Sequence, residues 1–460
     1  MKAPKTRILV LGGGFAGLEF CKNFEHADAE ITLIDRQNHH LFQPLLYQVA
    51  TTGLPDSDIA QPIRSIFRKR KDITVLKGEV KGIDLSGKTV AVGQQYLPYD
   101  YLVIGMGAKT SYFGNDQWAK YAPGMKSLDD AHFMRNKILN ALELAERTDD
   151  PDKRRRLMTI AIVGAGPTGV ELAGALTELI HTVMREDFRR INPKDVKIIL
   201  IEAAPRVLPP FTEANARRAH QHLRELGIEV RLNHMVKNIR EGVVVFEDSS
   251  IEAGNIFWTA GVGPGVWTRK LGVETDRAGR IVVEPHLNLP GYPEVFAVGD
   301  VAACTDIKGQ RVPGVSPAAM QMGRYVARLI RDELRGRPRD TRKGFAYWDK
   351  GAMAIIGRYR AVLQTKRLQF GGFFAWLGWL FVHVLFLYGF KSKLSVLQDW
   401  LYSYVFHRRR ARLILDQDRT FQHYLENPQV DNVGTVDGAT VQNQQDHELE
   451  LAAGTRGEGI

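Results

Sequence analysis

The chain has 460 residues, of which 44% are hydrophobic and 25% charged, so it is too apolar to be largely disordered and too long for one simple core. Its formal net charge of +10 and pI near 9.4 favour an anionic partner: a phosphate-bearing ligand, a nucleic acid or a membrane surface. The N-terminus, MKAPKTR, has no apolar signal-peptide core, so we expect a cytosolic body. Cys21 and Cys304 stand far apart, which excludes a paired redox motif and a cysteine metal site.

The first predicted unit, residues 8–35, reads as strand, glycine-rich turn, helix and strand. Gly12 permits the tight turn, Gly14 lets backbone amides approach a pyrophosphate, and Gly17 lets the helix pack on the strand. The diphosphate is favoured at the helix N-terminus, and Asp35 is spaced to accept hydrogen bonds from a ribose. This unit predicts a dinucleotide-binding site.

An irregular loop, residues 36–54, follows, and its histidines and aromatics break any clean periodicity. We expect an ordered loop with a short helix. It either fills the core or closes on the cofactor, with Pro44 to Tyr47 nearest. Residues 73–104 alternate short strand patterns with turns, and the last of these strands, 101–104, is expected to return to the first sheet.

The opening pattern is repeated in mid-chain, after a helix expected over residues 128–148. A strand is followed by three glycines at the same spacing, Gly164, Gly166 and Gly169, and then by a helix. A nucleotide-binding turn found twice in one chain is far more specific than a single copy. The duplication predicts two bound dinucleotides.

The second strand of this repeat ends at Glu202. A carboxylate there binds an adenosine ribose and repels a 2′-phosphate, so it predicts NADH over NADPH, although Arg206 is close enough to neutralise it. Glu171, just after Gly169, has two interpretations. It either stabilises the helix N-terminus, or lies beside the nicotinamide or along a proton route to a flavin.

Two later segments are expected to complete these sites. Residues 256–261, IFWTAG, repeat a strand-then-small-residue pattern and should return to the second sheet. Residues 295–302, VFAVGDVA, form a buried strand ending at Gly299 and Asp300. The aspartate either bonds a ribityl hydroxyl of FAD or caps the following helix.

The next helix is expected to begin with Ser316 as N-cap and Pro317 as its first residue. Its first turns carry Gln321, whose amide would face the flavin ring or a carbonyl substrate.

As a set, these motifs resemble the two-dinucleotide flavoproteins of the disulfide reductase superfamily and, among them, type II NADH:quinone oxidoreductases. The resemblance covers roughly residues 7–415 and rests on NHHLFQPLLYQVATTGL, GAGPTGVELAGAL, FWTAG, VGD, AAMQMGRYVA and the apolar C-terminal region. It implies hydride transfer from NADH to FAD, then passage of two electrons to a membrane quinone without proton pumping. The implied fold class is α/β, with two Rossmann-like dinucleotide-binding domains and C-terminal membrane-associating helices.

The resemblance also assigns residues to the cofactors. It places FAD at Gly12, Gly13, Gly14, Phe15, Ala16, Gly17, Asp35 and Asp300. It places NADH at Gly164, Gly166, Pro167, Thr168, Gly169 and Glu202, with Ala260 and Gly261 close by. Further cofactor contacts are expected from Arg36, Pro44, Leu45, Val80, Gly107, Ala108, Gly299, Ala318 and Gln321. Gln321 is the expected quinone-positioning residue, and Glu171 the expected proton-handling residue.

We expect an FAD-binding domain in two parts, residues 1–125 and 291–345, around an NADH-binding domain at 126–290. A membrane-associating region should cover 346–426. Residues 427–460 are polar and mildly acidic, and we expect them to be disordered.

Residues 371–390 contain no Asp, Glu, Lys or Arg, a length that suffices to span a bilayer. Basic residues flank both ends, so the positive-inside rule gives no orientation. Residues 394–415 place apolar side chains on one helical face beside a basic cluster, which is typical of a helix in the headgroup layer of anionic lipid. We favour peripheral, monotopic attachment to the cytoplasmic face of the cell membrane. A core or dimer-interface hairpin without lipid contact is the alternative.

Other activities were weighed against this one. A sulfide:quinone reductase shares the layout but uses sulfur-storing cysteines, which Cys21 and Cys304 do not suit. An NADH-sensing flavin-bearing binding protein would use its basic surface to hold nucleic acid. The basic clusters near 64–71 and 408–412 lack regular aromatic interleaving, so we expect no nucleic-acid partner. Homodimer formation stays open.

Overall fold

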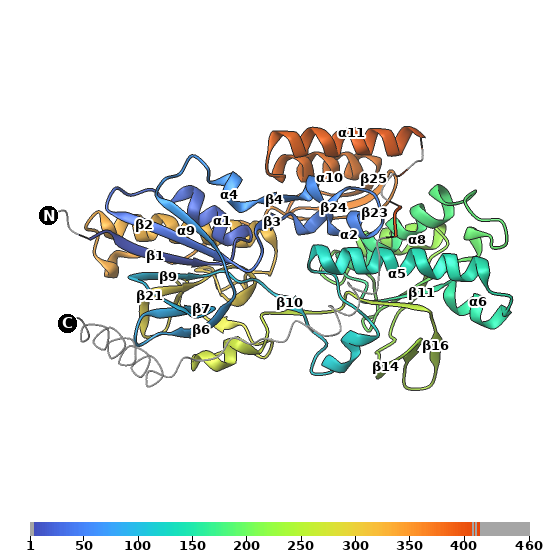
Figure 1. Cartoon of the computed structure of the whole chain (residues 1–460), viewed down its shortest axis with the longest axis horizontal. Helices are drawn as coiled ribbons and strands as arrows, with labels where there is room; N and C mark the ends of the chain where they lie inside the picture. Colours follow the sequence, from blue (N-terminus) through green and yellow to red (C-terminus); the bar gives the residue numbers. More distant parts are fainter. Residues whose placement is uncertain (1–3, 407–408, 410–411, 415–460) are drawn as a thin grey trace, which may run out of the picture.

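The computed structural model describes residues 4–406, 409 and 412–414, and the tail expected over 427–460 lies outside them. Two mostly parallel sheets form the framework, one toward each end of the elongated molecule (Figure 1). The first has the order β20-β21-β9-β1-β2-β5 and the second the order β13-β12-β11-β17. The first sheet consists of β1 (Thr6–Leu11), β2 (Ala29–Asp35), β5 (Ile73–Lys77), β9 (Tyr101–Ile104), β20 (Asn288–Leu289) and β21 (Tyr292–Ala297). The second consists of β11 (Thr159–Val163), β12 (Lys197–Ile201), β13 (Glu229–Arg231) and β17 (Asn255–Trp258).

Strand β1 is apolar on both faces because both are covered. Ile8 and Val10 pack with the helices of the first domain, α1 (Phe15–Asn23) and α9 (Ser316–Leu334). Leu9 and Leu11 pack on the opposite side, against the antiparallel meander β6 (Val80–Asp84), β7 (Thr89–Val92) and β8 (Gln95–Pro98). Alternation along a strand therefore divides one apolar run between two cores.

The expected returning strands are confirmed. Residues 101–104 form β9, which pairs in parallel with β1, and the late strand β21 pairs with β9. In the second sheet, β17 pairs in parallel with β11. The first sheet is therefore completed only after the chain has built the second.

The helices follow the prediction with one correction. The helix expected over 128–148 is α5 (Leu128–Arg147), whose start is fixed by a capping box between Ser127 and Asp130. The prediction of Ser316 as an N-cap is wrong: Ser316 is the first residue of α9 and Val315 occupies the cap, without a side-chain bond. Pro317 already holds the second position, so a preceding extended residue is enough to start the helix.

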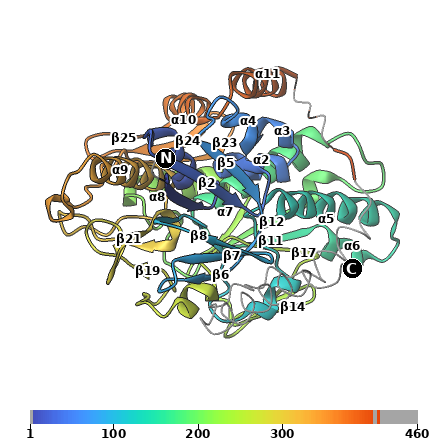
Figure 2. The same ribbon diagram turned by 60° about the vertical axis from the view of Figure 1, so that its left-hand side comes forward.

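The C-terminal region adds an antiparallel sheet of β23 (Ala352–Gly357), β24 (Arg360–Gln364) and β25 (Gln369–Gly372). The apolar run 371–390 is not one helix. It divides into the end of β25, the helix α10 (Phe373–Phe386) and a break at Gly389, where φ is +85°. Helix α11 (Phe390–Phe406) follows, and Figure 2 shows the two helices together along one side of the molecule. Within the described ranges, no helix has the length and apolarity to cross a membrane.

Candidate functional site: two nucleotide turns and a polar pocket

The first glycine turn has the geometry that its sequence predicts. Gly12 has φ of +100°, and a Cβ there would lie 2.4 Å from the carbonyl oxygen of Gly105. A Cβ on Gly17 would lie 2.0 Å from the Gly12 oxygen, whereas one on Gly14 would meet nothing within 4 Å. The turn therefore requires glycine at Gly12 and Gly17, where a side chain would clash with the backbone. Gly14 leaves open space at the N-terminus of α1, where a diphosphate fits.

Asp35 ends β2 and binds the same turn. Its carboxylate accepts hydrogen bonds from the amides of Gly13 at 2.6 Å and Gln37 at 2.7 Å. Burial raises the pKa of this carboxyl, and the two amides oppose that shift. On the other side, the Nδ1 of His40 lies 3.0 Å from the Gly13 carbonyl oxygen. Asp35 thus orders the turn as well as standing where a ribose is expected.

The second turn repeats this geometry. Gly164 has φ of +105°, and a Cβ on Gly169 would lie 1.9 Å from its carbonyl oxygen. Glu202 accepts hydrogen bonds from the amides of Ala165 at 2.7 Å and Ala204 at 2.9 Å. A Cβ on Gly166 again meets nothing within 4 Å. Both turns fit a dinucleotide.

Thr259 is a residue of the second turn that the sequence reasoning missed. Its hydroxyl lies 2.9 Å from the carbonyl oxygen of Val163 and 2.8 Å from that of Gly164. A Cβ on Gly164 would lie 2.6 Å from Cα of Ala260, so the two expected segments do meet. Arg206 donates to the Pro209 carbonyl.

Gly299, the residue before the late aspartate, lies against the start of α1. Gly299, with φ of +74°, faces the Cβ atoms of Ala16 and Ala319, so α1 and α9 begin at the same point. Asp300 belongs to a short 3-10 helix (Gly299–Val301) whose N-cap is Val298, so the alternative that it caps this helix is wrong. The sequence reasoning missed Lys126, a half-buried lysine whose pKa is lowered by desolvation and raised by the charge of Asp300.

The remaining expected contact residues belong to several different elements. Phe15 packs edge-on against His40, and Gln43–Leu45 form a 3-10 helix. Gln43 donates to the carbonyl oxygen of Lys126 at 3.3 Å, which places the 36–54 loop beside the Asp300 region. Leu45, Val80 and Ala318 are buried, Gly107 has φ of +71°, and the expected set also includes Arg36, Pro44, Ala108, Pro167, Thr168 and Gly261.

The amide of Gln321 is engaged on both sides by one residue. Its Nε2 donates to the Trp348 carbonyl at 3.0 Å, and its Oε1 accepts from the Trp348 amide at 3.0 Å. Gln321 therefore holds the segment that leads into β23, and the Trp348 ring is 70% exposed beside it.

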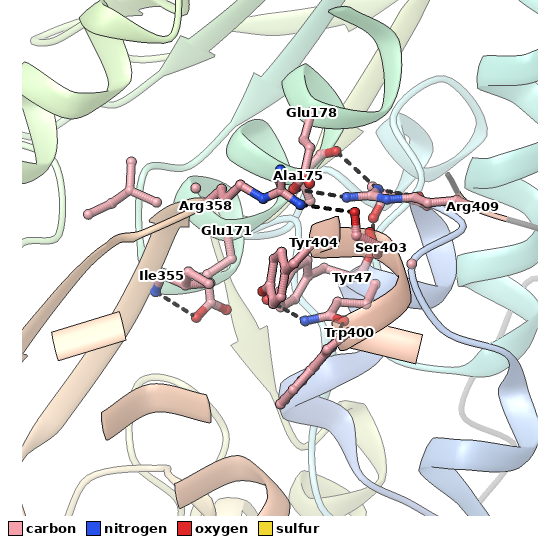
Figure 3. Close-up of a pocket in the computed structure, with 15 residues that line it drawn as sticks. Tyr47, Glu171, Ala175, Glu178, Ile355, Arg358, Trp400, Ser403, Tyr404 and Arg409 are labelled. Atoms are coloured by element: carbon pink, nitrogen blue, oxygen red, sulfur yellow. Dashed lines mark hydrogen bonds and ion pairs between the residues drawn. The ribbon is translucent and has the colours of Figure 1, made fainter. Parts of the chain in front are cut away.

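A small pocket, with about 40 Å³ of space for water-sized molecules, lies where helices α2 (Leu46–Ala50) and α7 (Pro167–Thr177), strand β23 and helix α11 meet (Figure 3). Glu171 lines it and accepts a hydrogen bond from the Ile355 amide at 3.4 Å. Burial raises the pKa of this carboxyl to about 8, so it is protonated at neutral pH. Glu171 lies beyond the first turn of α7, and its carboxyl accepts a hydrogen bond from the Ile355 amide of β23. The interpretation of Glu171 as a stabiliser of the helix N-terminus is therefore wrong.

A hydrogen-bonded rim surrounds the pocket. Trp400 donates to Gln48, which in turn donates to the hydroxyl of Tyr47 at 3.0 Å. Arg409 forms an ion pair with Glu178 at 3.0 Å. It also donates to the carbonyl of Thr51 at 2.7 Å, and Arg358 donates to that of Ser403 at 2.9 Å.

The outer faces of α10 and α11 are apolar and exposed. Their inner faces pack on the body, with Trp379, Val396 and Trp400 buried. His383 is half-buried, and its Nδ1 lies 2.7 Å from the Trp379 carbonyl oxygen, so the expected hydrogen bond is present. The large exposed side chains are Phe373, Phe374, Leu377, Phe381, Leu385, Phe390, Leu394, Leu397, Leu401, Val405 and Phe406.

Sulfur and metal chemistry find no support in the described residues. Cys21 and Cys304 are both buried, and burial raises the pKa of each thiol. Between residues 4 and 414, apart from the positions left undescribed, no cluster of three or more His, Cys, Asp or Glu side chains suits a metal ion.

Two family models match the chain. The model for the pyridine nucleotide-disulphide oxidoreductases matches residues 6–323, and the model for the NDH2 C-terminal domain matches residues 349–409. The duplicated turns and the first match show that the chain belongs to the pyridine nucleotide-disulphide oxidoreductase family.

Similar proteins narrow this assignment. The chain is 44% identical to the type II NADH:quinone oxidoreductase Ndh of Mycobacterium tuberculosis, over 92% of this chain and 93% of that protein. It is 42% identical to NdhA of the same organism, over 90% of each. The chain is a member of the type II NADH:quinone oxidoreductases.

Solved structures agree on the fold. The structure of NDH2 from Plasmodium falciparum in complex with NADH superposes with a TM-score of 0.82 at 20% identity, covering 90% of this chain and all of that one. The sulfide:quinone oxidoreductase of Aquifex aeolicus gives 0.67, also at 20% identity, covering 87% and 95%. The fold is shared more closely with the former.

Proposed function

We propose that the protein transfers a hydride from NADH to FAD and passes two electrons to a membrane quinone without pumping protons. Membership of the type II family carries this proposal, and the two equivalent nucleotide turns support it. FAD, when bound, supplies the redox chemistry between the two substrates. The residues of the chain bind the two substrates, align them with the flavin and handle the protons.

The first turn, with Asp35, Asp300 and Lys126, is proposed to hold FAD. The open space at Gly14 supports this, as does the meeting of α1 and α9 at Gly299. The proposed domain division keeps the sequence-based boundaries, 1–125 with 291–345 and 126–290. The strand pairing β1-β9-β21 supports it.

The second turn is proposed to hold NADH, with Glu202 as the carboxylate toward the adenosine ribose. Arg206 donates to the Pro209 carbonyl, so its guanidinium has a partner other than the Glu202 carboxylate. That arrangement supports the preference for NADH over NADPH.

Glu171 is proposed to handle the proton of the reaction, since a carboxyl with a pKa of about 8 both holds and releases a proton near neutral pH. Gln321 is proposed to position the Trp348 segment against the quinone. Its two bonds to the Trp348 backbone support that role.

The exposed apolar face of α10 and α11 is proposed to dock on an anionic lipid surface at the cytoplasmic face of the membrane, as a monotopic attachment. Lys391 and Lys393 at the start of α11 add positive charge there. The competing occupant is a second copy of the chain. Sedimentation in detergent-free buffer would detect a dimer, whereas sedimentation together with vesicles would detect lipid binding.

The test of the overall proposal is spectroscopic. The purified protein should be yellow, lose its colour on anaerobic addition of NADH and regain it with a soluble quinone. A sulfide:quinone reductase would be bleached by sulfide, and an NADH-sensing binding protein would turn over slowly or not at all. A colourless protein that takes up no flavin on reconstitution would refute the assignment.

A further inference from the structure

Phe113 combines an unfavourable backbone conformation with an exposed aromatic side chain. Its φ is +54°, and the residue is 68% exposed. A positive φ is unfavourable for any residue that has a Cβ, and an exposed ring gains little from burial to offset it. Residues held in such conformations cluster at ligand sites, where the surrounding structure fixes them. Phe113 is therefore a candidate for contact with a ligand.

A second exposed aromatic residue with positive φ has a structural explanation that Phe113 lacks. Tyr359, with φ of +61°, is 46% exposed, and its ring packs against those of Phe373 and Trp376. Among the residues that the structure describes, the ring of Phe113 has a single aromatic partner, Trp258, at a centroid distance of 6.2 Å. Packing with other rings thus accounts for the position of Tyr359 but accounts little for that of Phe113.

The backbone before Phe113 is fixed on the second nucleotide domain. Strand β10 (Lys109–Thr110) pairs antiparallel with β18 (Val262–Gly263). The amide of Ser111 then donates to the carbonyl of Gly261 at 3.1 Å. The Phe113 ring lies on that same glycine, where a Cβ would be 2.6 Å from the ring's Cζ atom. These contacts hold the ring beside the segment that follows β17.

The segment that carries Phe113 also connects the two nucleotide turns. At its start, the carbonyl oxygen of Gly105 meets Gly12 of the first turn. At its end, the Phe113 ring meets Gly261, beside the second turn. Figure 1 shows β10 between the two domains. A hydride can pass from NADH to FAD only if the nicotinamide reaches from the second turn toward the first, so we expect it to extend along this segment.

The order of strands indicates which half of NADH reaches Phe113. In the second sheet, β11 lies between β12 and β17. The diphosphate is proposed at the turn after β11, and the adenosine ribose at Glu202, directly after β12. The other half of the coenzyme, the nicotinamide riboside, then extends toward the end of β17. Gly261 and the Phe113 ring lie there.

We propose that Phe113 packs against the nicotinamide riboside of NADH and raises the affinity for that half of the coenzyme. The inference rests on the proposed function, because it adds a contact to the site proposed there for NADH. Contact with the coenzyme would bury a ring that is exposed in the free protein. Because the strand pair and the Ser111 bond already fix the segment, little conformational freedom is lost on binding.

The test compares two ligands by calorimetry on the oxidised, flavin-loaded protein. NAD⁺ contains the nicotinamide riboside, whereas ADP has the adenosine and both phosphates but lacks it. Phe113→Gly removes the ring, and glycine adopts a positive φ freely, so the fold should be retained. We expect the dissociation constant of NAD⁺ to rise roughly tenfold and that of ADP to stay unchanged. Phe113→Tyr keeps an aromatic ring and should bind NAD⁺ as the unsubstituted protein does.

Tyr359→Gly is the matched control, because it makes the same change at the other exposed aromatic residue with positive φ. It should leave both dissociation constants unchanged. An unchanged NAD⁺ affinity in Phe113→Gly, or an equal loss of affinity for NAD⁺ and ADP, would overturn the inference and leave the proposed function intact. If the unsubstituted, flavin-loaded protein bound neither ligand and was not bleached by NADH, the proposed function itself would be refuted.

Discussion

The two nucleotide turns share the same backbone geometry but differ in the segments that pack on the helix after each turn. In each, a glycine with positive φ is followed five residues later by a glycine that nearly touches its carbonyl oxygen, at Gly12 and Gly17 and again at Gly164 and Gly169. In each, an acid at the end of the next strand accepts two amides.

What surrounds each turn comes from a different late segment. Helix α1 is met by α9, where a Cβ on Gly323 would lie 2.2 Å from the Ala16 oxygen. Helix α7 is met by β23, where a Cβ on Gly174 would lie 1.8 Å from the Ile356 oxygen. The same local motif thus occurs twice, but its surroundings differ. A distant segment makes the first turn part of the proposed flavin site, and another makes the helix after the second turn a wall of the polar pocket.

The largest expected effect separates the two turns. Gly17→Ala and Gly169→Ala each force a methyl group to within about 2 Å of a carbonyl oxygen, a strain of roughly 1–3 kcal/mol. Gly17→Ala should yield a colourless protein. Gly169→Ala should stay yellow but no longer be bleached by NADH. Absorbance spectra before and after NADH check both, and the same phenotype in the two variants would show that the turns do not have separate ligands.

Glu171→Gln sharpens the contrast between α7 and α1, because the equivalent carboxylate of α1, that of Glu19, forms an ion pair with Arg324. We expect kcat with quinone to fall about 100-fold, the scale of one lost acid–base group, with NADH binding retained. Steady-state kinetics against both substrates checks this. A rise in the NADH KM alone would make Glu171 a nucleotide-binding residue.

The same carboxyl gives a stability prediction. Its pKa is raised from 4.5 to about 8 in the folded protein, so between these values the folded state holds a proton that the unfolded state has lost. The free energy of unfolding must therefore fall as pH rises through this window, and must do so less in Glu171→Gln. Denaturant unfolding at several pH values compares the two proteins. Parallel curves would mean that the carboxyl is ionised in the folded state.

The outer face of α11 is the next target. Replacing Leu397, Leu401 and Val405 with serine removes exposed apolar side chains and leaves the buried Trp400 in place. Each lost side chain should weaken lipid attachment by about 1.5–3 kcal/mol. The variant should therefore no longer sediment together with anionic vesicles. Flavin content and activity with a soluble quinone should persist. Serine at the same number of exposed polar positions of α8 (Glu213–Glu225), such as Arg217, gives the control.

The smallest expected effect is on coenzyme choice. Glu202→Gln removes the charge that repels a 2′-phosphate and should raise the NADPH-to-NADH ratio of kcat/KM by roughly tenfold, which is about 1.4 kcal/mol. Arg206→Gln serves as its comparison and should change the ratio little, since Arg206 donates to Pro209. The opposite ranking would assign the discrimination to Arg206.

Features that depend on neighbours in sequence were predictable. The turns, β9, β17 and α5 follow from short patterns of glycine, apolar residues and caps. Lys126 and Thr259 were missed because their roles arise only when other strands and loops come beside the turns. The polar pocket was missed for the same reason, since it joins segments near residues 47, 171, 355 and 404.

Gln321 shows the limit of resemblance for a single residue. Sequence placed it in the first turns of α9, and it is there. Its amide, however, bonds both backbone groups of Trp348, a contact between segments 27 residues apart that no periodicity encodes. Its role toward quinone is best tested through the Trp348 segment.

The order of strands in the first sheet has a consequence for biosynthesis. β21 and α9 emerge from the ribosome after the whole intervening nucleotide unit, because they lie at Tyr292–Ala297 and Ser316–Leu334. The second nucleotide domain can therefore fold while the first domain still lacks β21 and α9. Nascent chains arrested before residue 290 should carry no flavin, whereas those extended beyond residue 345 and clear of the exit tunnel should acquire it.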